Sequence, residues 1–532
     1  MKTLNFLTTG AFATLLLLGS CTKDVDNPQG GGGEGGVVEG IPTYATVSLS
    51  QRTGAGTYAD AGNYVNGNSQ ASEVEKKITD AVVLVFNSDD VLENYVTLDV
   101  VTEGDAGNQT TVAKKTFATT TGKKRLYALA NLGDYSKIEA IFNGQTAANK
   151  KLSYVCKVIQ QIADISGATA DNKFWMSNVY KLGATIEDQV EVLNVDQTTA
   201  AGGNGNDQTK NNFKVYIGRM VSKVTPTFAD NLVINSGDGT IEIKDGQDRT
   251  VAEYRVRNNP KRFYTFPVYE GTQLISPYYH RTYDLPNPTD YGDANTNVGK
   301  NDFFDNGHDA DDADGIAHTF VAAGTDSYLT ENSPKEAKRH KVTFLSIKAK
   351  WTPNANALLL DKDGSIADDA AATLKKITDA APTGNGGTFY RVQKWQGGKI
   401  VGYCPGIYAE TPERWTDVGG TPGNGQGALN TAVADRNAAK ASAGACYLIV
   451  TYDQGMAYWA YWMRSRLDGT IAEKYALKRN NHYKVNIISV DGVGDPNEDD
   501  NLDKDEDLEA DASMKATIEV LNWNVVDIEG GI

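Results

Sequence analysis

The chain is 532 residues long, which is enough for two or three domains with separate hydrophobic cores. Its 40% hydrophobic and 22% charged residues are typical of globular protein, and the formal net charge of -17 argues against nucleic acid as a partner. Gly is frequent, at 53 residues, and Tyr (26) outnumbers Phe (15), which favours a β-rich chain with many turns.

The N-terminal residues 1–21 have the features of a targeting segment. Lys2 supplies a positive charge, and residues 6–18 are apolar but too short to span a membrane as a helix. The run Leu18-Gly19-Ser20-Cys21 resembles the cleavage site of bacterial lipoprotein precursors. We therefore expect a signal peptide over 1–21 and a lipid on Cys21, which would be the only membrane anchor.

A tether and one strand follow the signal peptide. Residues 22–40 contain a Gly-rich run that cannot build a core and indicates a flexible spacer. Over residues 44–50, the apolar Ala45, Val47 and Leu49 alternate with more polar neighbours, which is the period of a strand with one buried face.

A protease-sensitive loop is predicted directly after this strand. Residues 51–56 are small or polar, and such exposed loops are preferred sites of proteolysis. Arg52 is the only Arg before Arg125. One Arg-specific cut between Arg52 and Thr53 would therefore remove residues 22–52, with the lipid, the tether and the strand, as a propeptide.

Two β-sandwich domains are predicted for the body of the chain, one over 53–225 and one over 226–494. Pro226 marks the boundary, and an irregular helical pattern covers 133–166. The pattern of strands and loops is typical of antiparallel sandwiches with insertions. The clearest strands are 81–86, 125–131 and 213–224 in the first domain, and 342–351, 388–393, 446–452 and 482–490 in the second.

The C-terminal segment 495–532 combines an acidic linker with a strand. Residues 495–511 hold ten acidic side chains and one Lys, so we expect this part to be extended and mobile. The strand runs from Met514 to Val525. Its apolar positions change face between Val520 and Leu521, which predicts a kink or bulge and two short strands in series.

No catalytic, cofactor or metal motif is present in the sequence, so we expect a protein that is not an enzyme. Asp305–Asp314 and Asp495–Asp511 are acidic enough for calcium, but a solvated loop is the preferred interpretation of both. Cys404 and Cys446 could form a disulfide or remain buried thiols. Four aromatic residues could stack on sugars, although aromatic residues in a strand usually belong to the core; they are Tyr458, Trp459, Tyr461 and Trp462.

Several segments spread over the chain resemble the fimbrillins of Bacteroidetes, the shaft subunits of type V pili. The likeness is greatest to the major subunit of the short, Mfa-type fimbria of Porphyromonas. The matching segments are Cys21 in its cleavage site, the strand that ends at Arg52, Tyr127 to Asn131, Phe174 to Ser177, Gly218 to Met220, Tyr328 to Asn332, Tyr458 to Trp462, Arg479 to Tyr483, and Ala516 to Asp527.

The resemblance implies transthyretin-like sandwiches and assembly by donor-strand exchange. The precursor would be anchored to the outer membrane by its lipid, and an Arg-specific protease would cut after Arg52. Loss of the strand with Ala45, Val47 and Leu49 opens a groove, which the C-terminal strand of another copy fills, giving a head-to-tail homopolymer. The residues expected to fill the groove are Ile518, Val520, Leu521, Trp523 and Val525.

The same resemblance implies a fimbrium on the cell surface that supports adhesion, biofilm formation and virulence. Its partners would be anchor and accessory fimbrial subunits and ligands on host or bacterial surfaces. Two alternatives stay open at this point. One is an accessory or tip adhesin of the same fimbria, and the other is a surface-anchored lipoprotein that binds glycans.

Overall fold

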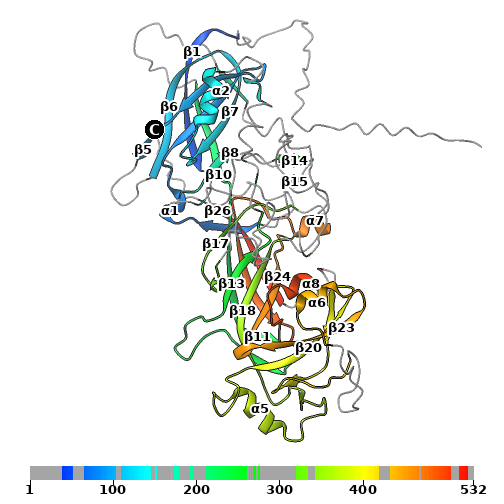
Figure 1. The fold of residues 1–532 in the computed structure, drawn as a ribbon. Coiled ribbons are helices and arrows are strands. Elements are labelled where there is room, and N and C mark those ends of the chain that lie inside the picture. Colours follow the sequence, from blue (N-terminus) through cyan, green and yellow to red (C-terminus); the bar gives the residue numbers. More distant parts are fainter. Residues whose placement is uncertain are drawn as a thin grey trace, which may run out of the picture.

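The computed structural model describes an elongated molecule with two β-rich parts, one formed mainly by the N-terminal half of the chain and one by the C-terminal half (Figure 1). The mainly β class predicted from the sequence is confirmed. The described residues are 39–51, 65–103, 110–144, 150–152, 169, 173–178, 192–195, 211–260, 263, 265, 268–270, 273–275, 319–333, 339, 342–417, 432–465, 469–504, 508 and 514–524.

The N-terminal part is one sheet of nine strands. In spatial order these are β4 (Leu92–Thr97), β3 (Ala81–Phe86), β7 (Gly122–Ala130), β8 (Met176–Asn178), β10 (Asn212–Arg219), β1 (Pro42–Gln51), β6 (Thr110–Thr120) and β5 (Asp99–Glu103), with β9 (Val192–Val195) paired to β7.

This sheet folds over, so that β4 comes close to β6 although the two are far apart in the strand order. The side-chain amide of Asn94 donates to the carbonyl of Ala118 at 3.0 Å, and the Glu93 carboxylate accepts hydrogen bonds from Thr119 and Thr120 at 2.9 Å. The folded sheet encloses one apolar core, to which all six residues of β3 contribute buried side chains.

The C-terminal part contains three five-stranded sheets and one hairpin. The first consists of β17 (Ser327–Leu329), β11 (Ser222–Ile234), β25 (Asn481–Val490), β26 (Met514–Asn524) and β2 (Val65–Gln70). The second has β12 (Gly239–Glu242), β18 (Phe344–Pro353), β13 (Glu253–Arg257), β16 (Val321–Ala322) and β24 (Met456–Trp462). The third has β19 (Leu359–Leu360), β22 (Ile407–Tyr408), β20 (Phe389–Gln396), β21 (Lys399–Tyr403) and β23 (Ala445–Tyr452), and the hairpin is β14 (Val268–Glu270) with β15 (Gln273–Ile275).

Helices are short and lie between the strands. The longest are α2 (Ser136–Gly144), whose Ile138 and Ile141 pack on the N-terminal core, and α5 (Ala370–Thr378). The other helices in the part of the chain that the structure describes are α1 (Glu73–Lys76), α6 (Arg436–Ala441), α7 (Ile471–Lys474), α8 (Asp500–Asp503) and a 3-10 turn at Asp453–Gly455.

Most of the strands expected from the sequence are present, and β3 matches its predicted bounds in full. The single strand expected over 213–224 is wrong, because it is two strands, β10 and β11, separated at 220–221. Pro226 lies inside β11 rather than between elements. Of the helical pattern over 133–166, the structure describes α2, and residues 153–166 lie outside the described part.

The C-terminal expectations need two corrections. The acidic linker is not an extended mobile segment over its described part, because 495–504 is folded and contains the buried helix α8. The final segment is one strand, β26, rather than two in series. The register irregularity beside Val520 and Leu521 lies in the partner strand β2, between Val65 and Gly67.

Candidate functional site

Strand β1 lies in the interior of the N-terminal sheet. Residues 46–51 pair in parallel with 212–217 of β10, and residues 42–49 pair antiparallel with 113–120 of β6. Both backbone edges of β1 are therefore satisfied by neighbours, and its loss would separate β10 from β6 and leave two unpaired ladders.

The side chains of β1 follow the predicted alternation. Ala45, Val47 and Leu49 are 2%, 0% and 3% exposed, and Val47 and Leu49 belong to the N-terminal core. On the other face, Tyr44 is 47% exposed. The hydroxyl groups of Thr46 and Thr116 lie 2.7 Å apart on that face and join β1 to β6. Burial of one Val- or Leu-sized side chain contributes about 1.5–3 kcal/mol, so β1 is a substantial part of this core.

Strand β26 lies in the other part of the molecule, against its own chain. It pairs antiparallel with β25, where Tyr483 lies opposite Val520 and His482 opposite Leu521. Ile518 lies opposite Val485, and the side chain of Ala516 packs against the core of the C-terminal part. The predicted groove and the predicted strand that fills it are therefore in separate sheets of one chain.

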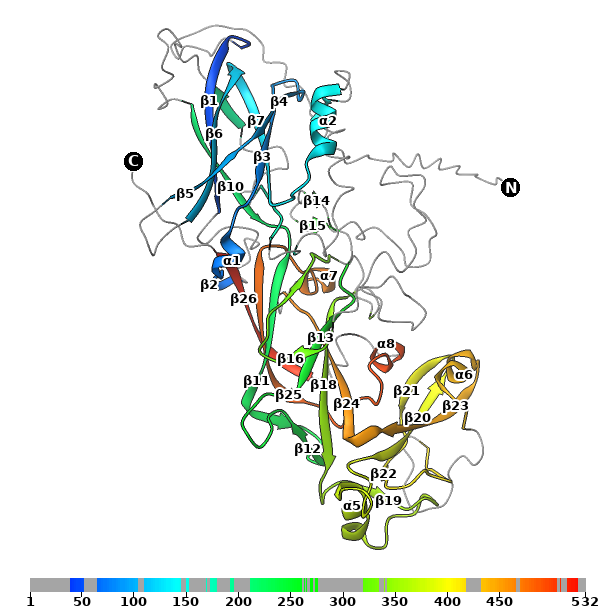
Figure 2. The same cartoon turned by 60° about the vertical axis from the view of Figure 1, so that its left-hand side comes forward.

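The other edge of β26 is covered from Val520 to Asn524 by β2, an element that the sequence did not predict. The two strands run parallel, with Asn68 opposite Asn522 and Ser69 opposite Trp523. Figure 2 shows β2 and α1, in blue, lying against β26, in red, between the two parts of the molecule. Between β1 and β2 lie residues 52–64, so the chain leaves one sheet and joins the other across the predicted cleavage site.

Several predicted site residues fall outside the described residues. They are Cys21, Arg52, Thr53 and Val525. Of the residues expected to fill the groove, Ile518, Val520, Leu521 and Trp523 have a defined backbone register in β26.

A buried polar cluster fixes the junction between the two parts. Glu75 forms a capping box with Ser72 at the start of α1. Its carboxylate lies 3.2 Å from Lys223 Nζ and accepts a hydrogen bond from the Tyr328 hydroxyl at 2.9 Å. The Arg219 guanidinium donates to the Glu75 backbone carbonyl at 2.8 and 3.0 Å. The Ser-x-x-Glu spacing is a sequence pattern that indicates this helix start. The tertiary partners of Glu75 could not be predicted from that pattern.

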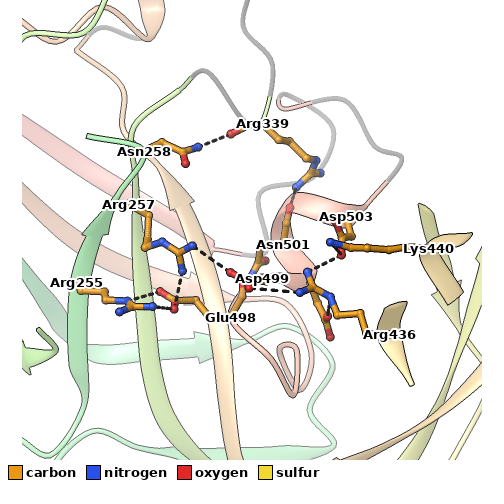
Figure 3. A network of polar contacts seen from close by, with 11 residues as sticks. Arg255, Arg257, Asn258, Arg339, Arg436, Lys440, Glu498, Asp499, Asn501 and Asp503 are labelled. Atoms are coloured by element: carbon orange, nitrogen blue, oxygen red, sulfur yellow. Dashed lines mark hydrogen bonds and ion pairs between the residues drawn. The ribbon is translucent and has the colours of Figure 1, made fainter. Parts of the chain in front are cut away.

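A second ionic cluster holds the segment that precedes β26 (Figure 3). Arg255 Nε donates to Glu498 at 2.7 Å, and Arg257 contacts both Glu498 at 2.6 Å and Asp499 at 3.0 Å. Arg436 contacts Asp499 at 3.3 Å and is paired with acidic groups of α8 as well. The acidic residues therefore have basic partners, which explains why this run is folded rather than extended by self-repulsion.

Burial and charge shift the pKa values in this cluster in opposite directions. Burial alone would raise the pKa of Glu498, but the hydrogen bond from Arg255 and the charges of Arg257 and Arg255 outweigh it and lower the pKa. For Asp500, burial and the charge of Asp495 raise the pKa to about 7. Asp500 is held by a hydrogen bond of 2.7 Å from the Gln393 amide.

Other candidate sites from the sequence have structural roles where they are described. Cys404 and Cys446 are buried free thiols. The aromatic residues of β24 line the core, with Trp459 0% and Trp462 3% exposed, so they form no exposed platform for a sugar. Residues 361–364 form a turn in which Gly364 has φ +82°. Among the described residues, no cluster of three or more His, Cys, Asp or Glu side chains is arranged to hold a metal ion, and no helix is long and apolar enough to cross a membrane.

Three solved structures, from two bacterial species, are similar to this chain. A putative cell adhesion protein of Parabacteroides distasonis has 11% identity and a TM-score of 0.43, covering 91% of this chain and 100% of its own. A fimbrilin of Porphyromonas gingivalis has 14% identity and a TM-score of 0.40, covering 91% and 98%. The tip fimbrial protein Mfa3 of the same species, with a C-terminal truncation, has 14% identity and a TM-score of 0.31, covering 91% and 100%.

No curated protein matches the chain. Two family models do match it, at opposite ends. The model described as major fimbrial subunit protein (FimA) matches residues 45–219, from β1 to β10. The model described as major fimbrial subunit protein type IV, fimbrillin, C-terminal matches residues 450–529, which include β24, β25 and β26. The chain belongs to the fimbrillin family of Bacteroidetes and is a subunit of a cell-surface fimbria.

Proposed function

We propose that this chain is a structural subunit that polymerises by protease-triggered donor-strand exchange, as in the short fimbriae whose major subunit it resembles. The observation that carries the proposal is the position of β1. This strand is internal to its sheet and buried, yet it is followed directly by the residues 52–64 that contain the single early Arg. A cut after Arg52 would leave β1 held by pairing and packing alone.

Loss of β1 creates a site that needs a replacement strand. The vacated position has unpaired backbone groups on β10 and β6 and an apolar stripe where Val47 and Leu49 had packed. Both are costly in water. A strand from another copy restores the ladder and the core together, which is strand addition. Because the donor strand and the groove are in different sheets of one chain, repetition gives an open head-to-tail fibre.

The ionic cluster limits how far the donor strand reaches. The chain is held up to Lys504, whose ammonium lies 3.1 Å from Asp495, and Leu508 is 2% exposed. With 495–508 in place, the residues 509–513 span at most about 20 Å when fully extended. The groove of the neighbouring subunit must therefore lie close to α8, so we expect tight end-to-end contact between subunits.

The lipid on Cys21, the removal of residues 22–52 and the outer-membrane stage of the precursor belong to the same proposal. The lipid would hold the uncut chain at the membrane, and the cut would separate the fibre-forming part from its anchor. Adhesion and biofilm formation would follow from the fibre as a whole, and no catalytic step is required of this chain.

The test is to treat purified residues 22–532 with an Arg-specific protease, determine the new N-terminus and image the product by electron microscopy. A start at Thr53 together with fibres supports the proposal. The matched controls are Arg52→Ala, which should stay uncut and monomeric, and a chain that ends at Asp511, which should be cut without forming fibres. Fibres from the shortened chain would show that β26 is not the donor.

A further inference from the structure

We propose that β2 is a built-in cover for the outer edge of β26, which prevents that edge from pairing with another chain until the polypeptide is cut between β1 and β2. The inference rests on the proposed function in taking β26 as the donated strand. It adds that one cut acts on both strands. The cut separates β1 from the rest of the chain, and it loosens the cover on the strand that will replace β1 in another copy.

The strand order shows what β2 covers. Among the described residues, β2 is the edge strand of the sheet β17-β11-β25-β26-β2, and β26 is the next strand inward. Without it, β26 would present a row of unpaired N–H and C=O groups, which is a template for pairing with any exposed strand. A donor strand that is exposed before its acceptor groove is open would favour wrong pairing, so a cover has a physical purpose here.

The composition of β2 indicates that it is a weak strand. Its six residues are Val-Asn-Gly-Asn-Ser-Gln, and Asn and Gly are depleted in strands because they pack poorly on a pleated surface. It pairs with β26 in parallel, the less stable arrangement, and its register slips between Val65 and Gly67. Such a strand depends on the points at which the chain fixes its two ends.

The C-terminal end of β2 is fixed firmly. Ala71 separates it from the capping box at Ser72, and Glu75 is held in the buried junction by Lys223 and Tyr328. This anchor does not involve β1, so it would remain after a cut at Arg52. We therefore expect β2 to fray from its other end and to pivot about α1 rather than to leave the molecule.

In the part of the chain that the structure describes, the element that precedes β2 is β1. The chain runs from Gln51 in the N-terminal sheet through residues 52–64 to Val65. After the cut, β2 would follow a new chain end, and terminal segments are poorly ordered unless they are tied down. The outer edge of β26 would then open while its pairing with β25 still holds it in place, ready for exchange.

The first experiment measures amide hydrogen exchange in uncut chains, so it needs no fibre. The Arg52→Ala chain is compared with and without Asn68→Pro, because Pro removes a ladder donor and does not fit inside a paired strand. We expect residues 520–524, which pair with β2, to exchange at least about fivefold faster when the cover is broken, which corresponds to the loss of one ladder hydrogen bond. Unchanged exchange over 520–524 would overturn the inference.

Two controls separate a specific effect from damage to the fold. Thr102→Pro places the same change in β5, an edge strand of the other sheet, and should leave exchange at 514–524 unchanged. In Asn68→Pro, exchange over β3 should match the parent chain. If exchange over β3 differs from the parent chain, Asn68→Thr becomes the deciding variant. Thr forms strands better than Asn, so this change should strengthen β2 and slow exchange in the paired part of β26. An unchanged rate would count against the cover.

The second experiment closes the cover with a disulfide. Asn68 and Asn522 lie opposite one another, so Asn68→Cys with Asn522→Cys can be oxidised to join β2 and β26. After cleavage, the oxidised chain should form no fibres and reduction should restore them, while each single variant forms fibres under both conditions. Fibres at an equal rate from the verified cross-linked chain would refute the inference. Failure of the cleaved wild-type chain to form fibres would instead refute the proposed function. The hydrogen-exchange experiment would still test whether β2 protects the outer edge of β26.

Discussion

Glu75 and Lys223 form an ion pair of 3.2 Å whose side chains are only 3% and 6% exposed, and this pair joins α1 to β11 at the junction of the two parts of the molecule. Its position next to β2 means that the short helix α1 anchors β2, a strand that belongs to a sheet of the C-terminal part of the molecule. Loss of one member of a buried pair leaves an uncompensated charge, which is far more costly than loss of an exposed pair.

We therefore predict that Glu75→Ala destabilises the uncut chain by about 3 kcal/mol. This is the lower end of the cost of breaking a buried pair, because Lys223 keeps Asp326 as a second partner at 3.1 Å. Asp99→Ala is the matched control, since Asp99 and Lys115 are also 3.2 Å apart but are 66% and 40% exposed. That change should cost less than about 1 kcal/mol. Urea unfolding of the two variants measures the difference, and equal costs would contradict a buried anchor.

The side chains of β1 should matter before cleavage and not after it. Leu49→Ala removes a buried side chain, so it should lower the free energy of unfolding of the uncut chain by about 2–4 kcal/mol. Fibres formed after cleavage no longer contain β1, and their resistance to denaturant should equal that of wild-type fibres. Tyr44→Ala, at an exposed position of the same strand, should have little effect on either. A Leu49→Ala fibre that is weaker than wild type would show that β1 is retained.

His482 gives the junction a dependence on pH. Burial lowers its pKa to about 4, with the charge of Lys223 acting in the same direction, from an ordinary value of 6.5. Between these two pH values the unfolded chain binds more protons than the folded one, so stability is lost as the pH falls from 6.5 towards 4. The Thr225 hydroxyl lies 2.7 Å from His482 Nε2.

We expect His482→Gln to reduce this loss by about 1–2 kcal/mol over the same range of pH. Thermal unfolding at several pH values between 4 and 7 is the measurement, with the difference between variant and wild type as the quantity compared. A difference that does not change with pH would mean that His482 does not titrate as a buried neutral group.

Asp500 should act with the opposite sign. Because its pKa is raised to about 7, the folded chain binds the proton more tightly than the unfolded one between about pH 4 and 7. Stability is therefore lost as the pH rises through this range. Asp500→Asn keeps an acceptor for Gln393 and removes the titration, so the variant should gain stability relative to wild type at pH 7 and not at pH 4. An equal effect at both pH values would assign the change to packing alone.

Local patterns in the sequence were sufficient to predict individual strands. The alternation of Ala45, Val47 and Leu49 predicted a half-buried strand, and the structure places these three side chains in the interior. The apolar run 81–86 likewise predicted β3 with its bounds. These predictions succeed because a strand repeats every two residues, so its buried face is visible within a short window.

The acidic segment shows where such reasoning fails. Ten acidic residues over 495–511 predicted self-repulsion and an extended chain, yet Glu498 and Asp499 are paired with Arg255 and Arg257, more than two hundred residues earlier in the sequence. Charge counted along the chain carries no information on basic side chains that approach through the fold. Burial of α8 then fixes the start of the C-terminal arm, which the composition alone assigned to solvent.

The sequence by itself determined that this chain has a strand-like segment that ends just before its first Arg, a second strand towards the other end and a mainly β body between them. Only the tertiary structure decided that β1 is an internal strand, that β26 is paired on both edges and that the weak segment Val65–Gln70 is one of its partners. The physical reason is that periodicity specifies which face of a strand is apolar, whereas the choice of neighbour depends on backbone hydrogen bonds, which every strand offers alike.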